Sequence, residues 1–377
     1  MKAPFVYGTA ADSQHFTDRE KETLRLKNNF EYGVNTIIIS PRRWGKTSLV
    51  NKVASMFDKN RKIQIVRIDA FSVRSEEDFY RLFATEIIKQ TASKAEEWIV
   101  TAKNYLSTLV PAISVTADPM NPLSLSFNNM NKRYSDDVLH LPEQIAQEKG
   151  IQIVVCIDEF QQIGELSDSV FLQKKLRSVW QHQQATSYCL FGSKKHLLMN
   201  MFNKYSMPFY KFGDVISLER IPLACWQSYI QERFINSGKE ISDDFIRQIY
   251  EYVDGNSSYV QQLSWLIWIA TDKVVNDEIF TQAKNNLINL NGALFLEQLG
   301  NLTSYQLNFL RALLCGKGDD INKKETIDKF ELGSSANVST IKKALQKKEV
   351  IEVSGKNITF TDPLLPHWFH DNINLWL

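Results

Sequence analysis

Short apolar runs alternate with helix-like segments through the first part of the chain. Apolar side chains fill most of residues 36–39, and the alternating run 63–70 carries an acidic residue near its end. A helix-like segment follows the first run, and residues 75–90 place apolar side chains at helical spacing. Because strands that alternate with helices are typical of βαβ units, this pattern predicts a parallel, doubly wound sheet.

Three later apolar runs extend the predicted sheet. Residues 151–157 are almost continuously apolar, as expected of a strand that is covered on both faces. A helix over 171–183 leads to the run 187–191, and residues 215–218 are expected to form the last core strand. The core is therefore an α/β domain over residues 1–220.

The segment between residues 91 and 140 departs from this rhythm. Residues 113–117 and 123–127 each alternate apolar with small polar side chains, and turn-forming residues separate them. The pattern predicts a β-hairpin inserted into the core at about residues 110–130. Such a hairpin either binds a partner or packs locally, and local packing is slightly favoured.

A capped helix is expected before the first strand. Thr17 or Asp18 is a plausible N-cap, and Leu24, Leu26 and Phe30 supply the apolar positions. Acidic residues in the first turn suit the helix dipole.

The chain after residue 220 is mostly helical in pattern. Aromatic and aliphatic residues at helical spacing predict a helical lid over residues 221–295. Three short helical segments and a hairpin-like wing follow, which is the organisation of a winged-helix domain over residues 300–377.

Composition indicates the class of protein but does not indicate which partner it binds. Over 377 residues, 44 Lys and Arg nearly cancel 43 Asp and Glu, so any nucleic-acid binding must come from a local patch. The four cysteines form no C-x-x-C pair and read as reduced core residues. No run approaches the ~18 apolar residues of a membrane span, so a cytoplasmic protein is expected.

Candidate chemistry begins where the first strand ends. The strand runs into a basic turn and then a helix, which is the context that a phosphate-binding loop requires. Lys46 would neutralise β/γ-phosphate charge, the Thr47 hydroxyl would hold Mg²⁺, and Gly45 would let the backbone approach the phosphates. The predicted nucleotide-binding residues of this loop are Ser40, Arg42, Arg43, Trp44, Gly45, Lys46, Thr47 and Ser48.

Acidic and polar residues follow two later strands. Asp158 and Glu159 come directly after the run 151–157, at the edge of the sheet where ligands bind. Asp158 is expected to hold the metal, and Glu159 to orient or activate the attacking water. Ser193, at the end of the next strand, is expected to sense the γ-phosphate or that water. Arg177 and the pair Lys194-Lys195 are further possible phosphate contacts.

Taken together, these segments resemble the prokaryotic ATPase-domain family often called archaeal-type ATPases. That family is related to the AAA+ proteins and to the signal-transduction ATPases with numerous domains. The segments that carry the resemblance are Phe5-Val6-Tyr7-Gly8, Phe16 with Arg19-Glu20, Pro41 to Leu49, Ile157-Asp158-Glu159-Phe160-Gln161, and Gly192-Ser193.

The resemblance implies an AAA-like parallel sheet with Walker-type roles at the loop and the acidic pair. It also implies that Tyr7 and Gly8, with Phe16 and Arg19, flank the adenine, and that ATP bridges core and lid. Four positions depart from the family pattern and bear on the hydrolysis rate: Ser40 and Asp18 stand where glycine is usual, Phe209 to Phe212 lack an arginine, and Ser257 stands where proline is usual.

The sequence therefore predicts a Mg²⁺-dependent, ATP-binding P-loop ATPase whose product is a conformational change. One alternative is a DNA-binding regulator in which the nucleotide is structural or exchanges slowly. Another is a signalling switch whose tail, residues 300–377, contacts a partner protein. The lysines that would form a phosphate-contacting face on the tail are Lys342, Lys343, Lys347, Lys348 and Lys356.

Overall fold

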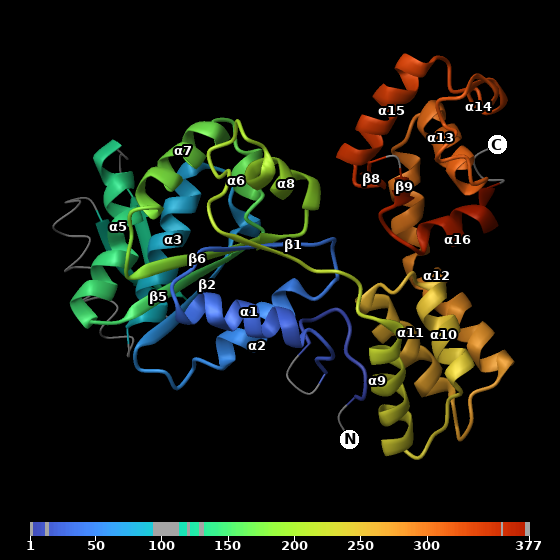
Figure 1. Cartoon of the computed structure of the whole chain (residues 1–377), viewed down its shortest axis with the longest axis horizontal. Helices are drawn as coiled ribbons and strands as arrows, with labels where there is room; N and C mark the ends of the chain where they lie inside the picture. The colour runs from blue at the N-terminus through green and yellow to red at the C-terminus, as the bar shows by residue number, and fades with distance from the viewer. Residues whose placement is uncertain are drawn as a thin grey trace. The chain divides into compact units, whose positions relative to one another are not determined.

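The chain divides into two compact units. The structure, a computed structural model, describes residues 3–11, 15–92, 113–118, 121–127, 132–355 and 357–373. One unit is Ala10–Glu219, and the other combines Met1–Thr9 with Arg220–Leu377. Each unit is described by itself below (Figure 1).

A five-stranded parallel sheet forms the centre of the Ala10–Glu219 unit. Its strands lie in the order β2-β5-β6-β1-β7. Each pair of neighbouring strands in this sheet is parallel, which confirms the α/β fold expected from the alternating apolar runs. The strands are β1 (Thr36–Ile39), β2 (Ile63–Asp69), β5 (Gln152–Asp158), β6 (Thr186–Gly192) and β7 (Asp214–Ser217).

Helices cover both faces of this sheet, which explains why its central strands are almost continuously apolar. On one face, α1 (Glu20–Glu31) and α2 (Lys46–Ser55) pack against the sheet through a shared apolar cluster. On the other, α3 (Glu76–Thr91), α5 (Lys132–Lys149) and α7 (Ser169–Trp180) bury a larger cluster. Shorter elements are η1 (Ala70–Ser72), α6 (Gln162–Glu165) and α8 (Lys195–Asn203).

The start of α1 differs from the expectation. Asp18 and Arg19 both have left-handed backbone conformations, with φ of 58° and 73°. Arg19, not Thr17 or Asp18, occupies the N-cap position, and it makes no side-chain cap. An N-cap residue needs an extended backbone, so the left-handed turn prevents Asp18 from capping. Leu24, expected on the apolar side, is 59% exposed.

The predicted hairpin region contains an antiparallel pair of strands. β3 (Ile113–Asp118) pairs with β4 (Asn121–Phe127), with an irregularity between Thr116 and Asp118. The pair is separate from the central sheet.

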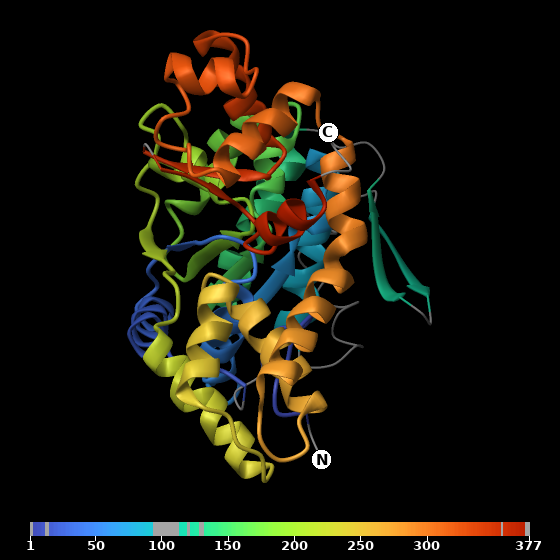
Figure 2. The ribbon, with the colours of Figure 1, turned by 90° about the vertical axis from the view of Figure 1, so that its right-hand side faces the viewer.

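The second unit is built on one long helix. α12 (Asp277–Gly300), orange in Figure 2, runs from the helices α9 (Leu223–Asn236), α10 (Asp243–Tyr252) and α11 (Ser257–Ala270) to the C-terminal elements. Those elements are α13 (Ser304–Leu314), α14 (Lys324–Lys329), α15 (Ser335–Lys347), β8 (Ile351–Ser354), β9 (Asn357–Phe360) and α16 (Leu365–Asp371). Among the described helices, none is both long and apolar enough to cross a membrane.

A single apolar cluster runs through this whole unit, from Phe5 to Phe369. Polar contacts join its earlier and later helices as well. The Tyr259 hydroxyl donates to Asp362 Oδ2 at 2.6 Å, and the His367 ring stacks on Tyr252 with centroids 4.3 Å apart. Residues 223–300 and 304–371 therefore share one core.

Candidate functional site

The loop after β1 turns the chain directly into a helix. β1 lies between β6 and β7, and α2 begins at Lys46. Gly45, the residue before the helix, has φ 87°, a left-handed conformation that glycine adopts without the cost of a Cβ. The helix N-terminus and its unpaired backbone N–H groups therefore face the carboxyl edge of the sheet, where an anion is favoured.

The ammonium of Lys46 is buried against this loop. Its Nζ donates to the carbonyl oxygens of Ser40 at 3.0 Å and Pro41 at 2.7 Å, and to Ser40 Oγ at 3.2 Å. Burial lowers the pKa of Lys46 to about 8, although the carboxylates of Asp158 and Glu159 oppose that shift. The loop thus concentrates a poorly solvated positive charge at the position predicted from the sequence.

Two oxygens, one from helix α2 and one from strand β5, meet beside Lys46. The Thr47 hydroxyl, in the first turn of α2, donates to Asp158 Oδ2 at 2.8 Å. The other carboxylate oxygen of Asp158 accepts from the Glu159 backbone N–H, also at 2.8 Å. Burial raises the pKa of Asp158, and these hydrogen bonds lower it in part. A cation at this position would relieve the cost of burying the carboxylate.

Hydroxyl and carboxylate oxygens are ligands that Mg²⁺ prefers, with water and phosphate oxygens completing its shell. The pair Thr47 and Asp158 fits that role. In the part of the chain that the structure describes, no three His, Cys, Asp or Glu side chains gather into a metal site.

Glu159 and Ser193 form a second contact at the same edge. The Ser193 hydroxyl donates to Glu159 Oε2 at 2.8 Å. Gln161, 1% exposed, donates its side-chain amide to the same oxygen. Sequence reasoning gave Gln161 no role, although it belongs to the motif that carries the resemblance. Gly192 completes the contact, because a Cβ there would overlap the Gln161 side chain.

The other predicted loop residues divide by exposure. Arg42 and Arg43 are exposed, and Trp44 is half-buried. Ser48 is buried, and its hydroxyl accepts a hydrogen bond from the backbone N–H of Ala11 at 2.9 Å. Ser48 therefore holds the segment before α1 against α2.

The residues predicted to flank the adenine are dispersed between the two units. Tyr7 and Gly8 belong to the Met1–Thr9 segment of one unit, whereas Phe16 and Arg19 belong to the other. Phe16 lies under the Lys52 ammonium, 3.8 Å from the ring centroid. A role beside the adenine stays a prediction for all four.

Arg19 is a buried connection within its unit. Its guanidinium donates to the carbonyl oxygens of Glu219 and Trp44 and pairs with Glu22 at 3.2 Å. The side chain is only 4% exposed. Because Trp44 lies in the loop and Glu219 follows β7, Arg19 ties the loop to the edge of the sheet.

Two other cations considered as phosphate contacts are bound elsewhere. Arg177 Nη1 donates to the carbonyl oxygens of Pro208 and Tyr210 at 2.7 and 2.6 Å. Lys194 pairs with Glu165 at 2.6 Å. Both side chains therefore hold neighbouring segments of the unit.

The lysines of the tail differ in their surroundings. Lys348 donates to the Asn301 carbonyl oxygen at 2.6 Å and to Gln306 Oε1 at 3.3 Å. Lys343 and Lys347 are exposed and Lys342 is half-buried. Lys356 lies outside the described residues.

Comparisons with known proteins agree with this geometry. Residues 16–263 match a family described as an ATPase domain predominantly from Archaea. An uncharacterised ATP-binding protein of Methanocaldococcus jannaschii is 26% identical over 172 residues, 43% of this chain and 47% of the relative. The matched part thus spans about half the length of that relative.

Solved structures of similar fold cover nearly the whole chain. The Walker-type ATPase of Pyrococcus abyssi has a TM-score of 0.66 at 16% identity, over 97% of this chain and 99% of that one. The ORC2 protein of Aeropyrum pernix, solved as ADPNP-ADP complexes, has a TM-score of 0.58 at 13% identity, over 98% of both chains. At these identities the likeness is one of fold.

Proposed function

Because this chain belongs to the family of ATPase domains predominantly from Archaea, and is an ATP-binding protein of that P-loop family, we propose that it hydrolyses ATP with Mg²⁺. The observation that carries the proposal is the 2.8 Å contact between the Thr47 hydroxyl and Asp158 Oδ2. A P-loop hydroxyl and a carboxylate from another strand of the same sheet are the two protein groups that hold the metal in this class of site.

Lys46 is the proposed phosphate-binding cation. Its ammonium is already at the loop, and its hydrogen-bond acceptors among the described residues are all neutral oxygens, the carbonyls of Ser40 and Pro41 and the Ser40 hydroxyl. Phosphate oxygens are stronger acceptors because they are charged. Bound Mg²⁺ would add further neutralisation of the phosphate charge.

Glu159 is the proposed group that orients the attacking water. Ser193 and Gln161 both donate hydrogen bonds to Oε2 of its carboxylate. These bonds fix the orientation of the carboxylate, so the other oxygen, Oε1, can point in a defined direction. Positioning of this kind accounts for most of catalysis in phosphoryl transfer, where the protein does little covalent chemistry.

The proposed output is a conformational change in the second unit. The shared core of residues 223–300 and 304–371 supports movement of lid and tail as one body. We also propose that the tail, with a winged-helix arrangement, contacts protein in preference to DNA. Of the four described lysines of this face, Lys348 is hydrogen-bonded within the unit, which leaves a small cationic surface.

Steady-state phosphate release by the full chain tests the proposal. We expect turnover that requires Mg²⁺ and is lost in excess EDTA. Lys46→Ala should abolish ATP binding, whereas Glu159→Gln should bind ATP and turn over slowly. Equal turnover by Glu159→Gln and wild type would remove Glu159 from the mechanism. Salt-insensitive or absent binding of labelled duplex by the full chain would support the protein-contacting tail.

A further inference from the structure

At both ends of the outer strand of the sheet, side chains form hydrogen bonds with the strand's backbone. β2 lies at one end of the strand order and pairs only with β5 among the described strands. Near its carboxyl end, the Arg67 N–H donates to Gln90 Oε1 at 2.9 Å, and Gln90 Nε2 donates to the Arg67 carbonyl oxygen at 2.7 Å. Near its start, Asn60 Oδ1 accepts from the Ile63 N–H at 3.2 Å.

These bonds define which residues of β2 face outward. In a strand, the N–H and C=O of alternate residues point to opposite sides, so Ile63, Ile65 and Arg67 face away from β5. The Lys62 carbonyl oxygen accepts from Gln152, which confirms that the intervening residues face β5. Between these two positions, no described strand pairs with the outward-facing N–H and C=O of Ile65, which form a donor and acceptor pair on the open edge.

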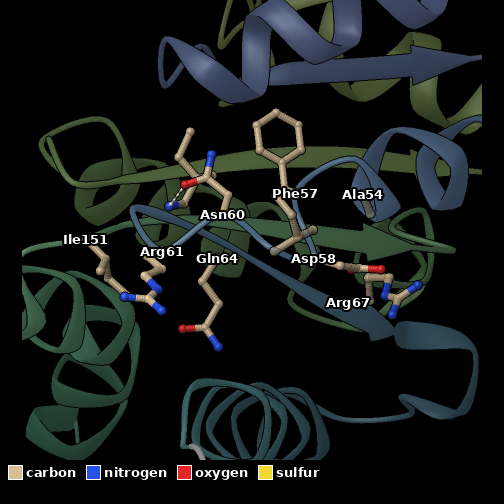
Figure 3. A pocket seen from close by; sticks show the side chains of 10 residues that line it. Ala54, Phe57, Asp58, Asn60, Arg61, Gln64, Arg67 and Ile151 are labelled. Atoms are coloured by element: carbon tan, nitrogen blue, oxygen red, sulfur yellow. Dashed lines mark hydrogen bonds between the residues drawn. The ribbon is translucent and has the colours of Figure 1, made fainter.

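A cavity of about 330 Å³ lies at this edge (Figure 3). Its apolar wall comes from Ala54, Phe57, Ile63 and Ile65, on the α2 face of the sheet. Its polar lining includes Asn60, Arg61, Gln64 and Arg67, and the figure shows Gln64 between the two arginines. This volume lies at the lower end of the range for ligand sites.

We propose that this cavity, the β2-edge groove, binds a short extended peptide that carries acidic side chains. The backbone of Ile65 would pair with one peptide amide, as in strand addition. An apolar peptide side chain would enter the wall formed by Phe57 and Ile65. Carboxylates would pair with Arg61 and Arg67, both exposed residues. Arg67 Nη1 also donates to Asn51 Oδ1 at 3.3 Å.

Charge complementarity favours an acidic occupant over a basic one. Among the residues that line the groove, Arg61 and Arg67 stand against the single carboxylate of Asp58. The turn leading into β2 adds Lys59 and Lys62. A free inorganic anion would use the guanidiniums alone, so the apolar wall and the Ile65 amide distinguish a peptide from phosphate.

Fluorescence anisotropy with the full chain tests the proposal. The probe is a fluorescein-labelled, amidated peptide of alternating valine and glutamate, and its control replaces glutamate with lysine. We expect saturable binding of the acidic peptide only. Binding of the lysine peptide with equal affinity, or competition by inorganic phosphate at equal charge concentration, would overturn the proposal.

Backbone pairing has its own test in the ligand. Two peptides are compared, each with alternate amides N-methylated and the two in opposite registers. The peptide whose methylated amides face Ile65 should bind at least 10-fold more weakly because one amide pair is lost, and the other should bind like the unmethylated peptide. Unchanged affinity of both methylated peptides would exclude strand addition. This comparison uses unaltered protein, so it is independent of any effect of mutation on folding.

Two protein variants act in opposite directions. Arg61→Glu combined with Arg67→Glu should weaken binding of the acidic peptide by 10-fold or more. Gln90→Ala frees the Arg67 backbone, extends the open edge, and should tighten binding. If Gln90→Ala folds, binds ATP normally and leaves peptide affinity unchanged or weaker, the proposed edge is wrong. Normal ATP binding in both variants keeps this outcome separate from that of the proposed ATPase.

Discussion

Thr47 and Asp158 lie 111 positions apart in the chain, and the Thr47 hydroxyl donates to Asp158 Oδ2 at 2.8 Å. The contact exists because β1 and β5 are parallel and separated only by β6, so the residues after both strands come to one edge of the sheet. It brings together the two groups that the sequence assigned to Mg²⁺ from unrelated segments.

Removal of either partner should impair Mg²⁺-dependent turnover. Thr47→Ala deletes the hydroxyl, and Asp158→Asn deletes the charge, so each should raise the Mg²⁺ concentration required for half-maximal turnover by 10-fold or more. Thr47→Ser keeps the hydroxyl and is the matched control, which should stay within a few-fold of wild type. A Mg²⁺ titration of phosphate release measures this. Identical Mg²⁺ curves for Thr47→Ala and Thr47→Ser would contradict the metal role.

ATP binding should weaken at alkaline pH. The pKa of Lys46 is lowered to about 8, chiefly by burial. Bound phosphate favours the ammonium and raises this pKa, so binding takes up a proton once the free protein has lost it. The Kd should therefore be flat below about pH 8 and rise above it, by at most ~10-fold per pH unit. Calorimetry in buffers of different ionisation enthalpy measures the proton uptake, and its absence at pH 9 would contradict the shift.

Loss of the Ser193 hydroxyl should slow turnover without weakening ATP binding. Ser193→Ala removes the 2.8 Å hydroxyl donor and leaves Glu159 Oε2 with the Gln161 amide and the longer, 3.4 Å contact from the backbone N–H of residue 193. We expect kcat to fall ~10-fold, less than the ~10²–10⁴-fold that a general acid or base itself contributes, because Glu159 is still present; KM should stay near wild type. Ser193→Thr restores a hydroxyl and should recover part of kcat. A rise in KM with unchanged kcat would instead indicate a contact with the ground-state nucleotide.

The strands, and the place where Thr47 and Asp158 meet, were predictable because their signals are local. An apolar run of strand length that ends in acidic residues, such as residues 151–159, predicts a buried strand and also predicts where that strand ends. The matched segments of the loop and the acidic pair then needed only parallel pairing to meet. The confirmed part of the prediction is the α/β fold, and it rests on the period of the apolar pattern.

Two departures from the family pattern, at Asp18 and Ser257, are explained by the backbone and capping geometry of the structure. Asp18 stands where glycine is usual, and its φ of 58° shows why glycine suits that position, although aspartate tolerates it. Ser257 stands where proline is usual, at the start of α11, but Asn256 caps that helix by accepting from Ser258 and Tyr259. Neither angle nor cap can be read from composition.

Long-range polar contacts were also beyond the sequence. Arg19 was predicted as a nucleotide contact, yet its donors reach the carbonyl of Glu219, 200 positions away. Nothing in the neighbourhood of Arg19 indicates that partner, since a backbone carbonyl has no sequence signature. In the sequence, the segment from Phe209 to Phe212 was notable only because it lacks the arginine usual in the family. In the structure, both phenylalanines are buried beside Trp180 in the core.

Gly192 should be the most sensitive small residue of the site. A Cβ at Gly192 would overlap the Gln161 side-chain oxygen and lie 3.1 Å from Glu159 Cα. The Gln161 side chain can rotate away, but the backbone of Glu159 cannot move without shifting its carboxylate. Gly192→Ala should therefore cost ~1–3 kcal/mol of stability, as overpacking does, and should lower kcat at least 10-fold. Gly318→Ala, where the nearest atom lies 3.4 Å from the new Cβ, is the matched control and should leave both unchanged. Chemical denaturation and phosphate release measure the two effects, and wild-type turnover by a folded Gly192→Ala protein would show that the position of Glu159 is not critical.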